Sequence, residues 1–296
     1  MQEKLFYINE NEEVIEFSAL SLYHANVAKI SGLSDIKNTL YTTASMGQDG
    51  ETVTGNKIQK RSIVVTGAIK STNKDVILAA KRQLSHVLNP HLKAKLVYEY
   101  NGERRLINCR LETAPIYKRG NALLTFEVDI ICAYPFWQDE NETQTNIAGF
   151  LGNFEFDLNG GGLQIPSSGL ELGIGSSEIV VAVINNGDIS TGLRAEFIAQ
   201  GTVTNPQLTN VTTAEFMQFN GLTMVAGDTL VVTTEYGKKA CKLYHNGEEI
   251  NALQYWNIDG TFLQLDIGSN YFQFTADTNP DRLTVNVYST NQYLGV

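Results

Sequence analysis

Histidines are the residues of this sequence that could most readily hold a metal or move a proton near neutral pH. The chain contains four of them, at His24, His86, His91 and His245. His86 and His91 are the nearest pair, but Pro90 lies between them and ends any helix there. They therefore lack the four-residue spacing on one helix face that a helical metal pair needs. We expect surface or capping histidines and no bound metal.

Cysteines and clustered carboxylates could also do chemistry. The cysteines are Cys109, Cys132 and Cys241, and carboxylates cluster at positions 12–13, 139–142 and 248–249. Three widely separated cysteines indicate buried free thiols in a protein made in a reducing cytosol. The acidic clusters fall in predicted turns, where water surrounds a carboxylate and no burial raises its pKa for acid catalysis. Nucleophile-elbow, zinc-protease and phosphate-loop motifs do not occur. The sequence predicts neither an enzyme nor a cofactor.

Aromatic side chains in the second half of the chain indicate a possible sugar-binding surface. Tyr244, Tyr255 and Trp256 lie near predicted turns, with the asparagines 246, 251 and 257 close by. A flat aromatic ring beside amide groups is a common way for β-sandwich proteins to hold sugars. The same three side chains could equally pack inside a sandwich. Both interpretations stay open at this point.

Composition bounds the remaining possibilities. The 296 residues include 22 Lys and Arg against 32 Asp and Glu, so the formal net charge is −10. A protein that grips nucleic acid draws affinity from a basic excess, which is lacking here. Hydrophobic residues make up 43% of the chain and charged residues 18%, a balance that supports folded cores. No signal peptide or membrane-spanning segment is expected, because the longest apolar run, 179–184, is too short.

The elements of the first half are encoded locally. Alternating apolar residues at 5–8 and 14–17 predict a hairpin, and the many β-branched residues at 63–69 predict a buried strand. Three- to four-residue apolar spacing predicts an amphipathic helix over 74–88, capped by Thr72 and stopped by Asn89-Pro90. The dipeptide Asn101-Gly102 predicts a second hairpin, and residues 122–133 a long strand. Residues 42–60 carry three glycines and no apolar period, so we expect a long loop or extended hairpin with a contact role.

The second half contains short predicted strands separated by turn signals, and no convincing helix. The first candidate strand is 154–156, and the turns include Asn186-Gly187-Asp188 and Asn246-Gly247. Strands at this spacing favour an antiparallel β-sandwich. The polar stretch after Tyr134-Pro135-Phe136-Trp137 marks a boundary. We predict a first domain over 1–137, a linker over 138–148 and a second domain over 149–296.

The order of several motifs resembles that of phage distal tail proteins, also called Dit or siphovirus-type tail components. In the first half the matching residues run from Gly47-Gln48-Asp49-Gly50 through Arg61, Val87-Leu88-Asn89-Pro90, Tyr98-Glu99-Tyr100-Asn101-Gly102 and Ala114-Pro115 to Tyr134-Pro135-Phe136-Trp137. In the second half they include Asn205-Pro206, Thr212-Thr213-Ala214-Glu215, Ala226-Gly227-Asp228 and Gly268-Ser269-Asn270. Ala214 stands where the family's turn has glycine. Each motif is weak by itself, but their order covers nearly the whole chain.

The resemblance implies a mainly β protein without catalysis. Its first domain would be a split β-barrel like that of tail-tube proteins, flanked by one α-helix, and its second a galectin-like antiparallel β-sandwich. Members form a ring, usually a homo-hexamer, that joins the tail-tube protein to the tail-tip or baseplate hub protein. DNA would pass through its channel without specific binding. The protein would be made in the bacterial host cytoplasm and would reside in the virion, with no membrane insertion.

These implications select the candidate contact residues. The outer domain would serve as a platform for receptor-binding components, while edge strands and the 42–60 segment would complete the sheet of a neighbouring subunit. The candidate inter-subunit contacts are Gly47, Gln48, Asp49, Gly50 and Arg61. The alternative function is a carbohydrate- or receptor-binding adhesion module, with Tyr244, Tyr255 and Trp256 as the candidate sugar contacts.

Overall fold

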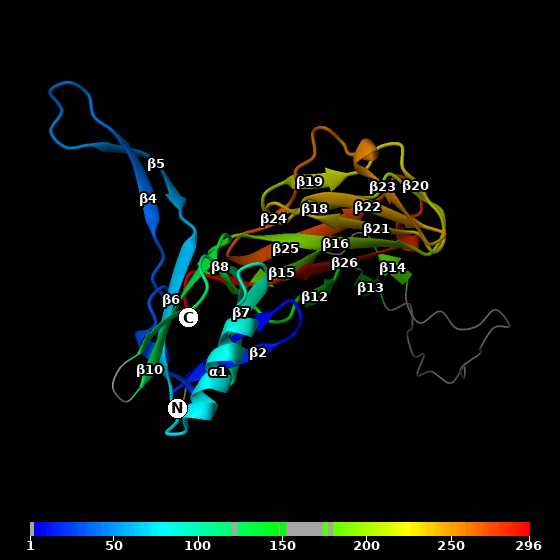
Figure 1. Cartoon of the computed structure of the whole chain (residues 1–296). Coiled ribbons are helices and arrows are strands. Elements are labelled where there is room, and N and C mark those ends of the chain that lie inside the picture. Colours follow the sequence, from blue (N-terminus) through cyan, green and yellow to red (C-terminus); the bar gives the residue numbers. More distant parts are fainter. Residues whose placement is uncertain (1–2, 120–122, 148, 152–173, 177–179) are drawn as a thin grey trace, which may run out of the picture. The chain divides into compact units, whose positions relative to one another are not determined.

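Strands make up most of the computed structural model, which describes residues 3–119, 123–147, 149–151, 174–176 and 180–296 (Figure 1). The chain divides into two units, Met1–Glu140 together with Gln292–Val296, and Asn141–Asn291. The expected second domain extended to residue 296, whereas the last five residues lie in the first unit. The expected linker also carries two short strands. The strand expected at 154–156 lies outside the described residues.

Twelve described strands and one α-helix build the first unit. They are β1 (Lys4–Asn9), β2 (Val14–Ser18), β3 (Tyr23–Ala25), β4 (Asn38–Thr43), β5 (Thr52–Ile58), β6 (Arg61–Ile69), α1 (Lys74–Val87), β7 (Ala94–Tyr100), β8 (Glu103–Leu111), β9 (Ile116–Arg119), β10 (Leu124–Cys132), β11 (Trp137–Asp139) and β27 (Gln292–Tyr293), with a 3-10 turn η1 at Val27–Lys29. The expected hairpins β1–β2 and β7–β8 are confirmed. The Asn101-Gly102 turn has positive φ at both residues, as a two-residue hairpin requires.

Seven of these strands close a barrel. Their order is β8-β7-β1-β2-β3-β6-β10, and β10 pairs with β8 at Ile130↔Leu111 to complete the circle. Alternate side chains point inward, so that large residues such as Tyr7, Phe17 and Phe126 are fully buried. The barrel interior is therefore filled by side chains and forms the core of the first unit.

The helix α1 packs its apolar stripe against this barrel. Ala80, Leu84 and Val87 are buried in the same core, as the spacing predicts. The N-cap is Asn73, whose side-chain oxygen accepts a hydrogen bond from the Asp75 backbone N–H at 2.9 Å. The expected cap at Thr72 is therefore wrong by one residue. Both residue types can cap, and the path of the preceding loop decides between them.

Close packing inside the barrel gives a first testable prediction. A Cβ at Gly67 would lie 2.7 Å from the His24 carbonyl oxygen and 2.4 Å from the Phe126 ring, so Gly67→Ala must displace backbone or a buried ring. We expect it to lower the free energy of unfolding by about 2 kcal/mol in urea denaturation. Gly55→Ala in β5 is the control, because its Cβ would meet only the Tyr41 ring at 3.9 Å. Equal stability of the two variants would contradict the packing argument.

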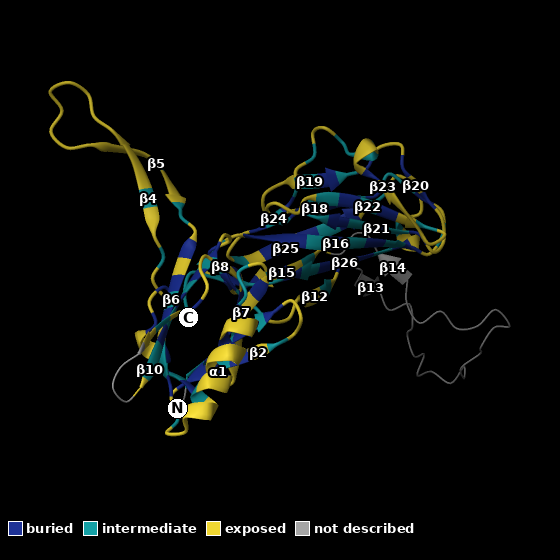
Figure 2. Cartoon of the chain, viewed as in Figure 1, coloured by how far each residue is buried: buried dark blue, intermediate teal, exposed yellow. Residues whose placement is uncertain are grey.

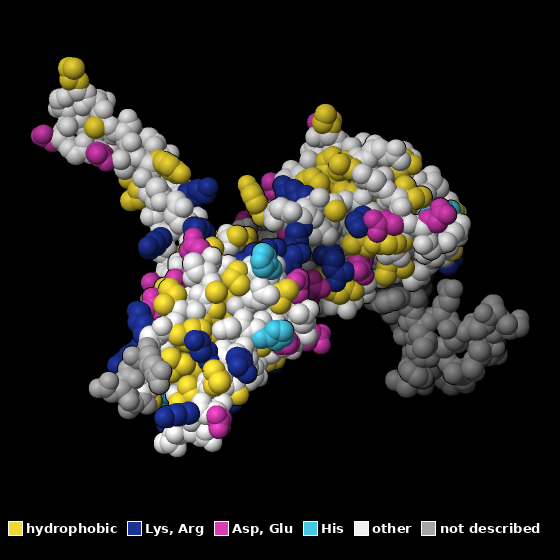
Figure 3. All heavy atoms as spheres, in the orientation of Figure 1, with side chains coloured by type: hydrophobic (Ala, Val, Ile, Leu, Met, Phe, Trp, Pro, Cys, Tyr) yellow, Lys and Arg dark blue, Asp and Glu magenta, His cyan; other side chains and the backbone are white. Residues whose placement is uncertain are grey.

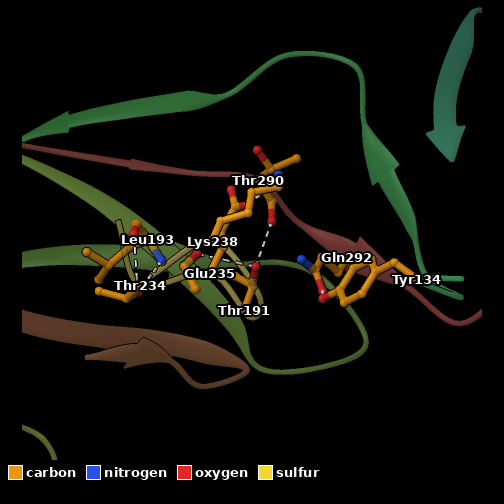
Figure 4. Close-up of polar contacts among 9 residues, drawn as sticks. Tyr134, Thr191, Leu193, Thr234, Glu235, Lys238, Thr290 and Gln292 are labelled. Carbon is orange, nitrogen blue, oxygen red and sulfur yellow. Dashed lines mark hydrogen bonds and ion pairs between the residues drawn. The ribbon is translucent and has the colours of Figure 1, made fainter. Parts of the chain in front are cut away.

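The end of the chain completes the first unit. β27 pairs with β11 through Trp137↔Tyr293 and Gln138↔Gln292. The Tyr134 hydroxyl donates to Gln292 Oε1 at 2.6 Å (Figure 4), and the Arg105 guanidinium lies 3.7 Å from the Tyr293 ring centroid. Val296 packs against the barrel core. The second unit is consequently an insertion between β11 and β27, connected to the first unit at both of its ends.

The second unit is an antiparallel sandwich of two main sheets around one core. Its elements are β12 (Thr143–Asn146), β13 (Gly149–Leu151), β14 (Ile174–Ser176), β15 (Val181–Asn185), β16 (Thr191–Ala199), β17 (Val203–Thr204), β18 (Gln207–Asn210), β19 (Glu215–Gln218), β20 (Thr223–Met224), β21 (Thr229–Thr233), β22 (Ala240–His245), β23 (Glu248–Asn251), β24 (Gln264–Leu265), β25 (Gly268–Thr275) and β26 (Leu283–Ser289), with 3-10 turns η2 (Leu253–Tyr255) and η3 (Pro280–Arg282). The larger sheet runs β12-β26-β16-β21-β22-β23 with β24 beside β16, and the smaller runs β15-β25-β18-β19. Both sheets contribute to one buried cluster, which includes Phe197, Val285 and Phe272.

Local contacts hold the sandwich strands in place. Thr234 Oγ1 accepts from the Leu193 N–H at 2.9 Å and donates to the Leu263 carbonyl, while Thr191 Oγ1 bonds to the Thr290 carbonyl (Figure 4). Ala214, between β18 and β19, has φ 58°, the region that favours the glycine of the family's turn. The mainly β expectation, with a barrel, one helix in the described part of the chain and a sandwich, is confirmed. A specific likeness to galectins stays a prediction.

Candidate functional site

The β4–β5 hairpin forms a sheet of its own. Its strands pair only with each other among the described residues, from Asn38↔Ile58 to Thr43↔Thr52, with a bulge near Tyr41. Nearly all of its side chains are exposed, unlike those of the barrel from which it extends (Figure 2). The expected extended hairpin at 42–60 is confirmed in kind, although its first strand begins at Asn38. A two-stranded hairpin without a packing partner is marginal in water.

Apolar side chains are exposed along this hairpin. Leu40 and Val53 are 56% and 57% exposed, and Met46 at the tip is fully exposed. Apolar and uncharged polar atoms dominate its surface, with acidic side chains close to the tip and basic ones at the base (Figure 3). Exposed apolar side chains on strands with a free edge are a typical feature of surfaces that another chain covers.

The four turn residues among the candidate contacts lie together at the tip of the hairpin. Gly47 and Gly50 have φ of 84° and 78°, which only glycine adopts without strain. The Gln48 side chain spans the turn, since its Oε1 accepts from the Ser45 N–H and its Nε2 donates to Thr52 Oγ1, both at 3.1 Å. Asp49 is exposed. The turn is thus shaped by glycines and one amide and leaves its outer surface open.

Arg61, the fifth candidate contact, lies elsewhere. It is 2% exposed, and its guanidinium donates to main-chain carbonyls inside its own subunit. Nε bonds to the Pro135 oxygen at 2.7 Å, Nη1 to Gly32 and Leu33 at 2.7 and 2.8 Å, and Nη2 to Leu294. Burial lowers the pKa of this guanidinium. A contact between subunits through the Arg61 side chain does not fit this burial.

Arg61 instead joins three distant parts of the first unit. The loop after η1, the segment before β11 and the end of the chain each supply a carbonyl to it. Trp137 Nε1 donates to the same Leu33 carbonyl at 2.9 Å. A buried carbonyl that loses a hydrogen-bond donor costs about 1–3 kcal/mol, so the bonds from Arg61 to Gly32 and Pro135 stabilise this part of the first unit. The role that the geometry assigns to Arg61 is structural.

The three candidate sugar-contact aromatics do not form one platform. Trp256 stacks on Phe262 with ring centroids 4.3 Å apart and meets Phe219 edge-on at 5.5 Å. Tyr255 also packs against the sandwich core. Tyr244 is partly exposed on β22, and its hydroxyl donates to Glu249 Oε2 at 3.2 Å. Tyr255 and Trp256 are therefore partly buried against the sandwich core, whereas Tyr244 lies on the surface, and sugar binding by these three residues stays a prediction.

A pocket of about 410 Å³ lies beside these aromatics, within the second unit. Its lining residues are Lys239, Ala240, Cys241, Lys242, Glu249, Asn251, Leu253 and Phe262. Lys242 Nζ lies 2.8 Å from Glu249 Oε1, and Lys239 Nζ is 4.9 Å from the centre of the Phe262 ring. The sequence analysis missed this site. Alternation along β22 indicates that Lys242 and Tyr244 lie on one face of the strand. Phe262 is far from them in the sequence, so nothing in the sequence indicates that it lines the same pocket as Lys242.

Two of the histidines each lie beside a carboxylate. His86 Nε2 lies 3.3 Å from Glu13, and His245 Nδ1 lies 2.7 Å from the buried Asp228. Asp228 also accepts from the Val225 N–H, so it closes its own turn. Within the described ranges no three His, Cys, Asp or Glu side chains are grouped as metal ligands.

The three cysteines are buried and free. Burial raises the pKa of Cys132 and Cys241 to about 12, and raises that of Cys109 as well. At neutral pH all three thiols are therefore protonated and poorly nucleophilic. Among the described helices, none has the length and apolar character needed to cross a membrane.

Comparisons with known proteins match both halves of the chain. The family model of the phage tail protein RIFT-related domain matches residues 21–132, and that of the siphovirus-type tail component, C-terminal domain, matches residues 186–292. The first match lies in the barrel unit and carries the hairpin, and the second lies almost wholly in the sandwich. A search among curated proteins found no match.

Two solved structures resemble the whole chain. One is the SPP1 Dit (gp 19.1) protein, whose crystal structure is described as a paradigm of the hub adsorption apparatus in phages that infect Gram-positive bacteria; the TM-score is 0.67 at 12% identity, over 97% of this chain and 98% of that one. The other is a chain of the phage P2 baseplate in its activated conformation with Ca, with a TM-score of 0.51 at 10% identity and complete coverage of both chains. At these identities the likeness establishes a shared fold.

Proposed function

Because the chain belongs to the siphovirus-type distal tail protein family and is a structural component of a phage tail, we propose that six copies form a ring that joins the tail tube to the tail tip or baseplate. The tail-tube protein would bind one side of this ring and the hub protein the other. The sandwich unit would be the attachment platform for receptor-binding components. The protein acts by assembly and needs no catalysis.

The observation that carries the ring proposal is the unpartnered β4–β5 hairpin. Its apolar side chains are exposed and its strand edges pair with no other described strand. The barrel offers a place for it, since β9 is the last strand of its sheet and, among the described strands, pairs only with β10. A hairpin from one subunit that adds to the edge of the next would continue the sheet around the ring.

The acidic charge fits this role. Six copies at −10 each would carry a net charge of roughly −60. A channel wall of negative potential would repel the phosphates of DNA, so the DNA would pass without binding to the wall. The carboxylates on the hairpin, Asp49 and Glu51, are exposed and are candidates for such a wall.

Negative-stain imaging of the purified protein tests the proposal. We expect six-fold rings with a central hole, and light scattering should give the mass of six chains. The same preparation should retain no duplex DNA in a gel-shift assay at physiological salt. Monomers at every protein concentration, or a ring with a different symmetry, would contradict the hexamer. Retention of DNA would contradict the proposed channel.

A further inference from the structure

The sandwich pocket has a lining that the ring function does not use. Its lining comes from β22, β23, η2, Lys239 and Phe262. Among the described strands, β22 and β23 are the last two of the larger sheet (Figure 1). Its volume of about 410 Å³ is in the range of small-molecule sites. From this geometry we propose that the pocket binds a saccharide carrying an anionic group.

Hydroxyl recognition comes from the polar side of the pocket. The β22–β23 register sets Lys242 opposite Asn251 and Tyr244 opposite Glu249, so their side chains share a face. Glu249 is held in place, since one oxygen meets Lys242 at 2.8 Å and the other accepts from Tyr244 at 3.2 Å. A fixed carboxylate beside an ammonium group and an amide offers acceptors and donors to neighbouring hydroxyls of a sugar ring.

The apolar side of the pocket suits the carbon skeleton of a sugar. Ala240, Leu253 and Phe262 supply apolar surface. The Phe262 ring stacks on the Trp256 ring at a centroid distance of 4.3 Å, which restricts its orientation. A ring fixed in this way presents a pre-organised surface, which reduces the entropy lost on binding. The Lys239 ammonium lies over the same ring, 4.9 Å from its centre, so a cation and an apolar ring adjoin each other in the pocket.

Charge selects the anionic group. Lys239 and Lys242 contribute two positive charges to the lining and Glu249 one negative charge, which leaves one positive charge uncompensated in the pocket. The Lys242–Glu249 pair also raises the pKa of Lys242, so the ammonium stays charged. A phosphate or carboxylate on the sugar would be the counter-charge for Lys239. A neutral sugar would lack this contact.

Titration of the full-length protein with defined probes tests the proposal. Glucose 6-phosphate and glucuronate are the anionic sugars, glucose is the neutral comparator, and inorganic phosphate is the anion without a sugar. Binding is followed by ligand-observed NMR and quantified by calorimetry. We expect either or both anionic sugars to bind at least about tenfold more tightly than glucose or inorganic phosphate. The two anionic arms show whether phosphate or carboxylate is preferred.

Variants at adjacent lysines locate the site. Lys239→Gln and Lys242→Gln should each weaken binding of the anionic sugar about tenfold. Lys238→Gln is the matched control, because it removes the same charge from a residue outside the pocket that pairs with Glu235 at 2.7 Å. The proposal would be overturned if neither anionic sugar bound, or if inorganic phosphate or glucose bound as tightly as the anionic sugars. Equal losses of affinity in all three lysine variants would overturn it as well. Light scattering on the same samples reports ring assembly separately.

Discussion

In the proposed ring, removal of the β4–β5 hairpin should leave monomers without unfolding either unit. Asn38 and Ile58 face each other across the hairpin, so Asn-Gly in place of residues 39–57 would connect them by a two-residue turn. No described hairpin residue belongs to either buried core. We therefore expect light scattering to fall from the mass of six chains to that of one, with the unfolding midpoint unchanged.

A milder variant tests the apolar contacts directly. Leu40→Thr with Val53→Thr keeps the strands but removes apolar surface that is more than half exposed in the single chain. The dissociation constant of the proposed ring should increase by at least about tenfold, since each apolar side chain covered in the ring contributes about 1–2 kcal/mol. Tyr236→Thr is the control, because Tyr236 is a strongly exposed side chain of the sandwich unit. A hexamer of unchanged stability after both hairpin changes would disprove the hairpin's role.

Loss of the Arg61 guanidinium should destabilise the first unit strongly. Arg61→Met fills much of the volume but leaves the carbonyls of Gly32, Pro135 and Leu294 without their donor. Breaking one side of a buried polar network costs about 3–5 kcal/mol. We expect a loss of that size in the free energy of unfolding of the first unit.

The two tryptophans allow this loss to be assigned to one unit. Trp137 is buried in the barrel core and Trp256 lies in the sandwich, so in a Trp256→Phe background the tryptophan fluorescence, excited at a wavelength that tyrosine does not absorb, comes from the first unit alone. Arg282→Met is the control, because Arg282 is largely exposed and its ion pair with Asp281 is a surface contact. A loss below about 1 kcal/mol for Arg61→Met would show that water replaces the guanidinium at no cost.

Elements with local signals could be predicted from the sequence. The turn of the β7–β8 hairpin needs only Asn101-Gly102, and α1 needs only its apolar period and the stop at Asn89-Pro90. The hairpin beyond the barrel followed from three glycines in a stretch without apolar alternation. The cap of α1 was placed one residue early, because Thr72 and Asn73 both have suitable side chains and only the backbone path selects one.

Tertiary structure alone decided the roles of Arg61, the chain end and the pocket. A charged residue at the start of a strand is ordinarily solvated, but Arg61, the first residue of β6, is buried where the carbonyls of residues 32, 135 and 294 accept its hydrogen bonds. β27 is two residues long and carries no signal of its own, so its return to the barrel depends on β11. Phe262 lies beside Lys239 and shares a pocket with Lys242 only because the sandwich packs these segments together. Hydrogen bonding in turns and the apolar period act between near neighbours, so α1 and the β7–β8 hairpin could be read from the sequence. The polar sites and β27 depend on residues far apart in the chain, which only the folded core brings together.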